Sequence, residues 1–420
     1  MRSCYNRTGF FIIIVYAVMA VISAVLLYAS LIPVIAGKLL DGSFDPAFEK
    51  LNSGDFAGYI SEFIKQFGSA MTSGSVWIVL GIVIGSALGL GLGIVVGKTV
   101  LRKLPADPPE KKTLSAGGFL FYVAGALGLW GLGVYAGNFP ALFFDLRSAG
   151  DSVSELIGDN ILPYLLYAVI GAPILEEITC RKIMLDRLRR FGELPAAFVT
   201  ALIFGLFHGN SGQFFLAFNV GLLFAVVYLK TGRIIYTMLL HGIINFIGST
   251  DGFLYLFGVT EIGGVPYASI LYIAVAVFGV VGCTLLAVSL IRRDGKLMLK
   301  PTYCAQGNRA IFRNPGMIIV VILFSVTVIS TDFMSLFMNI MVNRGLLSLT
   351  VLLPTVLFVV MLIVLLAKIG TRRTEEYVPV YTSAGESAEA APVSGLPEAE
   401  APAPITEQNP GGDQGSGSEE

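Results

Sequence analysis

The sequence predicts an all-α fold: a polytopic transmembrane helix bundle of about 10 spans (range about 8–10), followed by a disordered C-terminal tail. Two observations predict it. The chain is 55% hydrophobic and only 14% charged, with a mean hydropathy of +0.77, whereas soluble globular proteins carry about 25% charged residues. Apolar runs of about 20 residues also recur, each long enough to cross a bilayer. A soluble protein is therefore excluded, and we expect the lipid bilayer as a partner.

The predicted spans follow one another from the N-terminus. The first, residues 10–36, is too long for the apolar core of a signal peptide, so we expect it to remain as an anchor. A polar stretch, residues 37–72, separates it from the second span. The remaining nine are predicted at residues 76–97, 114–135, 161–185, 195–210, 213–230, 233–250, 270–291, 316–341 and 346–368.

A stripe of glycines marks the second span. Gly81, Gly85, Gly89, Gly93 and Gly97 recur at every fourth position and therefore share one face of a helix. Such a face allows a second helix to approach closely in lipid. We interpret the stripe as a packing surface rather than as the lining of a pore.

Lysines and arginines predict the orientation. They gather in loops that ten spans would place on one side, namely residues 98–112, 181–190, 230–233 and 292–313. Basic loops face the cytoplasm, so we expect a multi-pass protein of the cell membrane with both termini cytoplasmic. The net charge of −1 gives no indication of nucleic-acid binding, because the charges sit in loops and at the ends. No nucleic-acid partner is expected.

We expect four regions along the chain. Residues 1–159 form an N-terminal transmembrane region of about three spans, and residues 160–250 form a helical core. Residues 251–373 form a C-terminal transmembrane region of about three spans. Residues 374–420 are an acidic tail without lysine or arginine from Glu375 onward, and such a composition buries too little apolar surface to become ordered.

The core holds costly polar groups at membrane depth. Glu176 and Glu177 are adjacent within an apolar span, and ionisable residues in spans are functional-site candidates by default. Neighbours on a helix point about 100° apart, so the two carboxylates have different environments. Arg181 lies four residues after Glu177 and shares its face, which predicts an ion pair. Pro173 removes a helix hydrogen bond to Val169 and favours a kink.

Two histidines follow, and the chain contains no others. His208 ends the motif Phe-x-x-x-His, and His241 begins the motif His-x-x-x-Asn that ends at Asn245. Counted along antiparallel helices, Glu176 and His208 are at similar depth and His241 is shallower. We expect these groups to share one chamber in the bundle. Asn219, on the helix between them, is interpreted as an interhelical hydrogen-bonding residue.

The order Glu-Glu-x-x-x-Arg, Phe-x-x-x-His and His-x-x-x-Asn on successive spans resembles the CPBP family of intramembrane metalloproteases, which includes the CAAX prenyl endopeptidases and bacterial proteins linked to bacteriocin immunity. The resemblance covers about residues 160–250. Two positions depart from the family pattern: Cys180 replaces an aromatic residue and Lys182 replaces a glycine. Neither position performs chemistry in the family.

The resemblance implies an intramembrane endopeptidase that hydrolyses a peptide bond with an activated water. Glu176 would polarise the water, His208 would hold the water or a metal, and His241 and Asn245 would stabilise the oxyanion or complete a metal shell. Glu177 and Arg181 would support the site. The implied substrate is a membrane-associated protein or peptide. Prenylated CAAX proteins are the best-known substrates of the family, but the sequence identifies no prenyl pocket.

The role of metal stays open at this point. Two histidines and one carboxylate with an open position suit catalytic Zn²⁺, and the ligands would be Glu176, His208 and His241. The same groups without metal can act as a general base and an oxyanion hole. We favour the zinc description.

Two other functions compete with proteolysis. A catalytically silent member of the family would keep the motif for packing and serve as a membrane scaffold or binding protein. A transporter would also place carboxylates and histidines in spans, but it should show internal repeats. The two halves of this chain show no convincing repeat.

Overall fold

The computed structural model describes residues 2–71, 73, 75–138, 161–250, 253–254, 257–299 and 314–343. The chain divides into two units, Met1–Val378 and Pro379–Glu420, and every described residue belongs to the first. The described part is helical apart from turns and a short antiparallel pair of strands, β1 (Glu261–Ile262) and β2 (Val265–Pro266). The predicted last span and the predicted tail lie outside the described residues.

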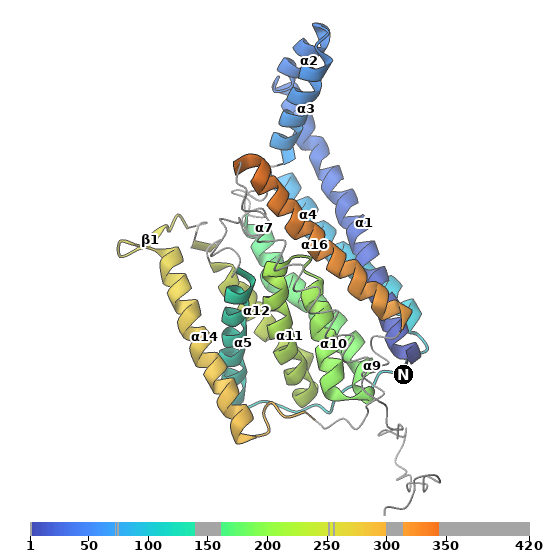
Figure 1. Cartoon of the computed structure of the whole chain (residues 1–420), viewed down its shortest axis with the longest axis vertical. Coiled ribbons are helices and arrows are strands. Elements are labelled where there is room, and N and C mark those ends of the chain that lie inside the picture. Colours follow the sequence, from blue (N-terminus) through green and yellow to red (C-terminus); the bar gives the residue numbers. More distant parts are fainter. Residues whose placement is uncertain are drawn as a thin grey trace, which may run out of the picture. The chain divides into compact units, whose positions relative to one another are not determined.

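The helices follow the predicted apolar runs (Figure 1). The longer ones are α1 (Arg2–Leu40), α4 (Val76–Leu101), α5 (Ala116–Asn138), α11 (Ser211–Thr231), α14 (Tyr267–Arg292) and α16 (Pro315–Asn343). The shorter ones are α2 (Asp45–Asn52), α3 (Phe56–Met71), α10 (Glu193–Leu206) and α12 (Ile234–Gly248). A composite helix consists of α7 (Ile161–Leu166), the π-helical η2 (Tyr167–Gly171), α8 (Ala172–Glu177), the π-helical η3 (Ile178–Leu185), α9 (Asp186–Leu188) and the 3₁₀-helical η4 (Arg189–Phe191).

The protein is a multi-pass membrane protein. Six helices of the described part are long and apolar enough to cross a bilayer. The predicted number of about 10 spans is not confirmed, and helix length is one physical reason. With 14 and 15 residues, α10 and α12 are shorter than the roughly 20 residues that a full crossing needs.

The glycine stripe is a packing surface, as predicted. All five of its glycines are buried in α4, and they lie against α1, which runs antiparallel beside α4. A β-carbon at Gly89 would stand 2.9 Å from the Met19 backbone, and one at Gly93 would stand 2.7 Å from the Val15 carbonyl. The absence of side chains therefore brings the two helix backbones into direct contact.

Gly89 and Gly91 offer a matched test of this contact. We expect Gly89→Val to force α1 away from α4 and to lower the thermal unfolding temperature of the purified protein by several degrees, because backbone cannot move aside. Gly91→Val adds the same atoms on the same helix, where nothing lies within 4 Å of the new β-carbon, and should change the temperature little. Equal effects of the two substitutions would contradict the packing role.

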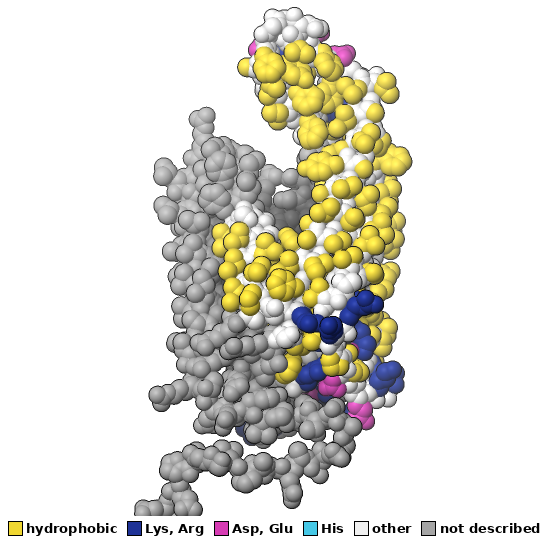
Figure 2. All heavy atoms as spheres, turned by 90° about the vertical axis from the view of Figure 1, so that its right-hand side faces the viewer, with side chains coloured by type: hydrophobic (Ala, Val, Ile, Leu, Met, Phe, Trp, Pro, Cys, Tyr) yellow, Lys and Arg dark blue, Asp and Glu magenta, His cyan; other side chains and the backbone are white. Residues whose placement is uncertain are grey.

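The described part of the polar stretch, residues 37–72, is mostly helical. The first helix continues to Leu40, and α2 and α3 form a hairpin after it. Four aromatic side chains recur along α3 at helical spacing, and each ring contacts the next: Phe56, Tyr59, Phe63 and Phe67. The average polarity of the whole stretch does not reveal this pattern. Figure 2 shows apolar side chains covering this hairpin.

The basic loops meet at one end of the bundle, as the charge pattern predicts. The backbone N–H of Asp107, in the loop before α5, donates to the carbonyl of Asp186 at 2.7 Å, and that of Lys112 donates to Thr231 at 2.7 Å. The Tyr122 hydroxyl of α5 bonds to a backbone carbonyl of the loop after α14. On the face in Figure 2, Lys and Arg gather at the end opposite to the α2–α3 hairpin.

Two clusters of buried apolar side chains meet at the composite helix. One joins α1, α4, α10, α11 and α16, and includes Met184 and Tyr228. The other joins α5, α11, α12 and α14, and includes Cys180, Phe204 and Phe224. The segment that carries the adjacent glutamates therefore packs between these two apolar clusters, and few of its polar groups are exposed.

Candidate active site

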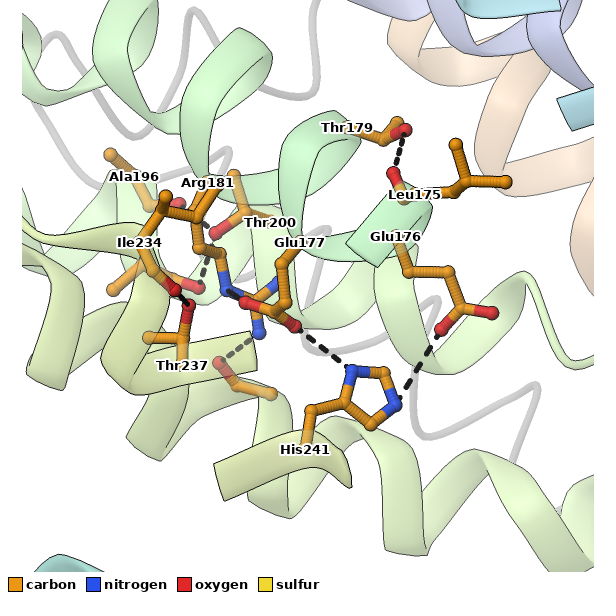
Figure 3. Close-up of polar contacts among 12 residues, drawn as sticks. Leu175, Glu176, Glu177, Thr179, Arg181, Ala196, Thr200, Ile234, Thr237 and His241 are labelled. Atoms are coloured by element: carbon orange, nitrogen blue, oxygen red, sulfur yellow. Dashed lines mark hydrogen bonds and ion pairs between the residues drawn. The ribbon is translucent and has the colours of Figure 1, made fainter. Parts of the chain in front are cut away.

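A chain of polar contacts runs from the composite helix to α12 (Figure 3). The His241 imidazole lies between the two glutamates. Its Nδ1 is 3.2 Å from Glu177 Oε1, and its Nε2 is 3.7 Å from Glu176 Oε2. On its other side Glu177 pairs with Arg181, at 3.1 Å between Oε2 and Nε. The four residues therefore form one continuous series: Arg181, Glu177, His241 and Glu176.

The Glu177–Arg181 pair is fully buried, and both side chains have an exposed fraction of 0%. Burial of two charges costs several kcal/mol unless they neutralise each other and find further partners. Arg181 Nη2 donates to the Gly221 carbonyl at 3.0 Å. Its guanidinium also stands over the rings of Phe204 and Phe224, at 5.1 and 5.8 Å from their centroids, where cation–π attraction adds to the pairing. The predicted ion pair is confirmed.

Glu176 has a different environment, as the 100° rotation between neighbours predicts. Its side chain is 26% exposed, whereas Glu177 is completely buried. Glu176 therefore has room for another molecule beside its carboxylate. The two adjacent glutamates divide into a structural carboxylate and an accessible one.

The proton positions follow from these contacts. Glu177, balanced by Arg181, is a carboxylate and only accepts hydrogen bonds, so Nδ1 of His241 carries the proton between them. With a single proton on the imidazole, Nε2 would be an acceptor, and it faces Glu176 Oε2. Their 3.7 Å separation is too long for a direct hydrogen bond. The pair can be satisfied by a proton or by a water molecule that donates to both.

His208 lies apart from this series. The helix α10 ends at Leu206, and His208 sits in the following turn, where its Nδ1 is 3.0 Å from the Phe204 carbonyl. The Phe204 ring meets both imidazoles edge-on, with centroids 5.3 Å from His208 and 5.4 Å from His241. Among the described residues, no polar contact joins His208 to either glutamate. The expectation that His208 shares one chamber with the glutamates stays a prediction.

Asn245 also has another partner. Its Nδ2 donates to the carbonyl of Ala168 in η2 at 2.8 Å, and no polar contact in the described part of the chain joins it to the glutamates. It lies four residues after His241 on α12 and so shares that face, as its spacing predicts. One of its amide donors is thus engaged by backbone.

The described residues do not fit a three-ligand metal centre. No group of three or more His, Cys, Asp and Glu side chains in this part of the chain lies close enough to hold a metal ion. Glu176 and His241 are neighbours, but His208 is turned toward the Phe204 carbonyl in the last turn of α10. The involvement of zinc therefore stays a prediction.

Three residues that support the series were not selected from the sequence. The Gly221 carbonyl accepts a hydrogen bond from Arg181, and a β-carbon at Gly221 would stand 2.8 Å from the Phe204 ring. Phe224 provides the second ring against the guanidinium, and the Thr237 side chain is buried beside Glu177 (Figure 3). A lone glycine or phenylalanine in an apolar helix gives no signal of such a role.

The two departures from the family pattern lie outside the polar series. Cys180 is 4% exposed and belongs to an apolar cluster. Lys182 pairs with Asp186 at 2.8 Å near the end of the composite helix. Both positions therefore serve packing and local charge balance.

Comparison with known families agrees with this segment. Residues 158–247 match the family described as Type II CAAX prenyl endopeptidase Rce1-like, a family of CAAX-type intramembrane proteases. The match contains all six residues predicted for the site and confirms the resemblance found in the motifs. Searches of curated proteins and of solved structures find no match.

Proposed function

We propose that this multi-pass membrane protein, with its Rce1-like segment, is an intramembrane endopeptidase that cleaves a membrane-associated protein or peptide. The observation that carries the proposal is the position of His241 between an accessible and a buried glutamate. Structural ion pairs alone do not require a second, partly exposed carboxylate beside the imidazole. A general base with an oriented partner does.

In the proposed reaction, a water molecule sits beside Glu176 and His241. It donates one hydrogen bond to the carboxylate and one to Nε2, which satisfies both facing acceptors. The water oxygen attacks the peptide carbonyl carbon while its proton passes to Glu176. The same carboxyl group then gives the proton to the leaving amine nitrogen as the C–N bond breaks. The products are a new carboxylic acid and a new amine, and proton transfer between them gives a carboxylate and an ammonium group.

Glu177 and Arg181 act through His241. The buried carboxylate fixes the tautomer and orientation of the imidazole by accepting its Nδ1–H, in the way a third group orients the base of other hydrolases. Arg181 balances the charge of Glu177 at a position where both side chains are fully buried. A role of His208 in holding water or metal is kept as a prediction.

The charge pattern supports a proposal for orientation. We propose that the end of the bundle where the basic loops meet faces the cytoplasm, and that both termini are cytoplasmic in a protein of the cell membrane.

The test compares protein termini in membranes of cells that make wild type, His241→Gln or Asn219→Ala at equal abundance. We expect new N- and C-termini with wild type, and a loss of about 10²–10⁴ in their rate of formation with His241→Gln. Asn219 is half-buried on α11, within the matched segment but outside the polar series, so Asn219→Ala should behave as wild type. Identical termini in all three, with each protein folded and inserted, would favour a catalytically silent family member.

A further inference from the structure

The turn before Pro173 leaves one backbone carbonyl without a donor in its own helix. In η2 the N–H of Ala172 donates to the Tyr167 carbonyl, five residues back, so it does not serve the carbonyl of Ala168. In a π-helix the Ala168 carbonyl would accept from the N–H of the residue five positions later, but that residue is Pro173, which has no N–H. The Ala168 carbonyl therefore lacks a helical partner in both the α and the π register.

Asn245 provides the missing donor from α12. Its Nδ2 is 2.8 Å from the Ala168 oxygen. One turn earlier on α12, Gly242 lies directly against η2, since a β-carbon there would stand 3.0 Å from the Val169 carbonyl. The glycine allows the close approach, and the asparagine satisfies the carbonyl that the approach would otherwise bury unpaired.

The same two helices carry the reacting groups. Asn245 is four residues after His241 on α12, and Glu176 is three residues after Pro173 on α8. The hydrogen bond therefore fastens α12 to the composite helix about one turn from the contacts of His241 with both glutamates. A change in this contact would change the separation between imidazole and carboxylates.

We propose that Asn245 is a positioning residue that holds His241 at its distance from Glu176 and Glu177 through the Ala168 carbonyl left unpaired by Pro173. This differs from the role that the family resemblance implies, in which the asparagine acts on the oxyanion or a metal. The catalytic consequence rests on the proposed function, whereas the hydrogen bond and its effect on His241 do not.

A cycle of variants of the full-length protein in detergent tests the bond without a substrate: Asn245→Ala, Pro173→Ala and the double variant. We expect Asn245→Ala to lower the thermal unfolding midpoint by about 2–4 °C, the shift typical for loss of one hydrogen bond. In the Pro173→Ala background the new N–H lets the helix satisfy its own carbonyls, so Asn245→Ala should change the midpoint little. Additive shifts, or no shift with Asn245→Ala, would overturn the proposal.

The position of His241 is read separately by nuclear magnetic resonance with isotope-labelled histidine. The chain has only two histidines, and His208→Gln assigns their imidazole signals. We expect Asn245→Ala to shift the His241 Nδ1–H signal and Asn219→Ala to leave it in place. An unshifted signal would overturn the positioning role even if stability fell. Both measurements remain decisive if no proteolysis is found, so failure of the proposed function is distinguishable.

Discussion

Replacement of Glu177 by glutamine should destabilise the protein more than any other single change in the polar series. The substitution keeps the size of the side chain but leaves the Arg181 guanidinium, which is 0% exposed, without its counter-charge. Breaking a buried pair in this way costs about 3–5 kcal/mol. The measurement is the thermal unfolding midpoint, together with the recovery of monodisperse protein in detergent.

Two further variants show whether the cost comes from the unpaired charge. In the double variant Glu177→Gln and Arg181→Met no charge stays unpaired, so much of the lost stability should return. Glu193→Gln changes another buried glutamate, which faces Arg189 at 3.9 Å near the end of the composite helix. We expect a smaller effect there because that contact is longer. Equal losses for Glu177→Gln and Glu193→Gln would contradict the role assigned to the Glu177–Arg181 pair.

Replacement of Glu176 by glutamine should abolish most activity and leave the fold intact. The side chain is 26% exposed and has no charged partner closer than 3.7 Å among the described residues, so an amide is accommodated at little cost. An amide cannot accept the proton of water, and loss of a general base reduces rates by about 10²–10⁴. The check is kcat on a substrate identified from the new termini, beside the unfolding midpoint. A variant that keeps a tenth or more of wild-type kcat would exclude Glu176 as the base.

The spacing of residues in the sequence was sufficient to predict several features of the site. Glu177 and Arg181 are one helical turn apart, and a spacing of four residues fixes that relationship in any helix. The different exposure of Glu176 and Glu177 follows from the rotation between neighbours. The glycine stripe of α4 likewise follows from its period, because small residues on one face leave a surface that another helix can fill.

Contacts between residues on different helices could not be predicted from the spacing of residues. Depth counted along straight helices predicts that His208 is level with Glu176, but this count does not reveal that α10 ends before His208 or that the His208 side chain turns to the Phe204 carbonyl. The π-helical turns on either side of α8 also alter its rotation, and no periodicity in the sequence marks them. The contact of Asn245 with Ala168 depends on both that turn and the close approach at Gly242.

The same reasoning explains why the sequence predicted the apolar spans but not the α2–α3 hairpin. Nine of the predicted spans coincide with described helices because apolar composition is a property of each segment alone. The α2–α3 hairpin was missed because its charged residues lower the mean hydropathy, while the aromatic period along α3 is visible only when positions are read separately.

The most direct test of the central claim is the incorporation of oxygen from water into cleaved protein. Purified wild type and Glu176→Gln would be reconstituted separately in vesicles with membrane proteins of the producing cells, in water labelled with heavy oxygen. Intact products would then be analysed by mass spectrometry. We predict labelled new C-termini with wild type and none above background with Glu176→Gln. Labelled termini formed equally by both proteins, or by neither, would contradict a hydrolytic site built on Glu176 and His241.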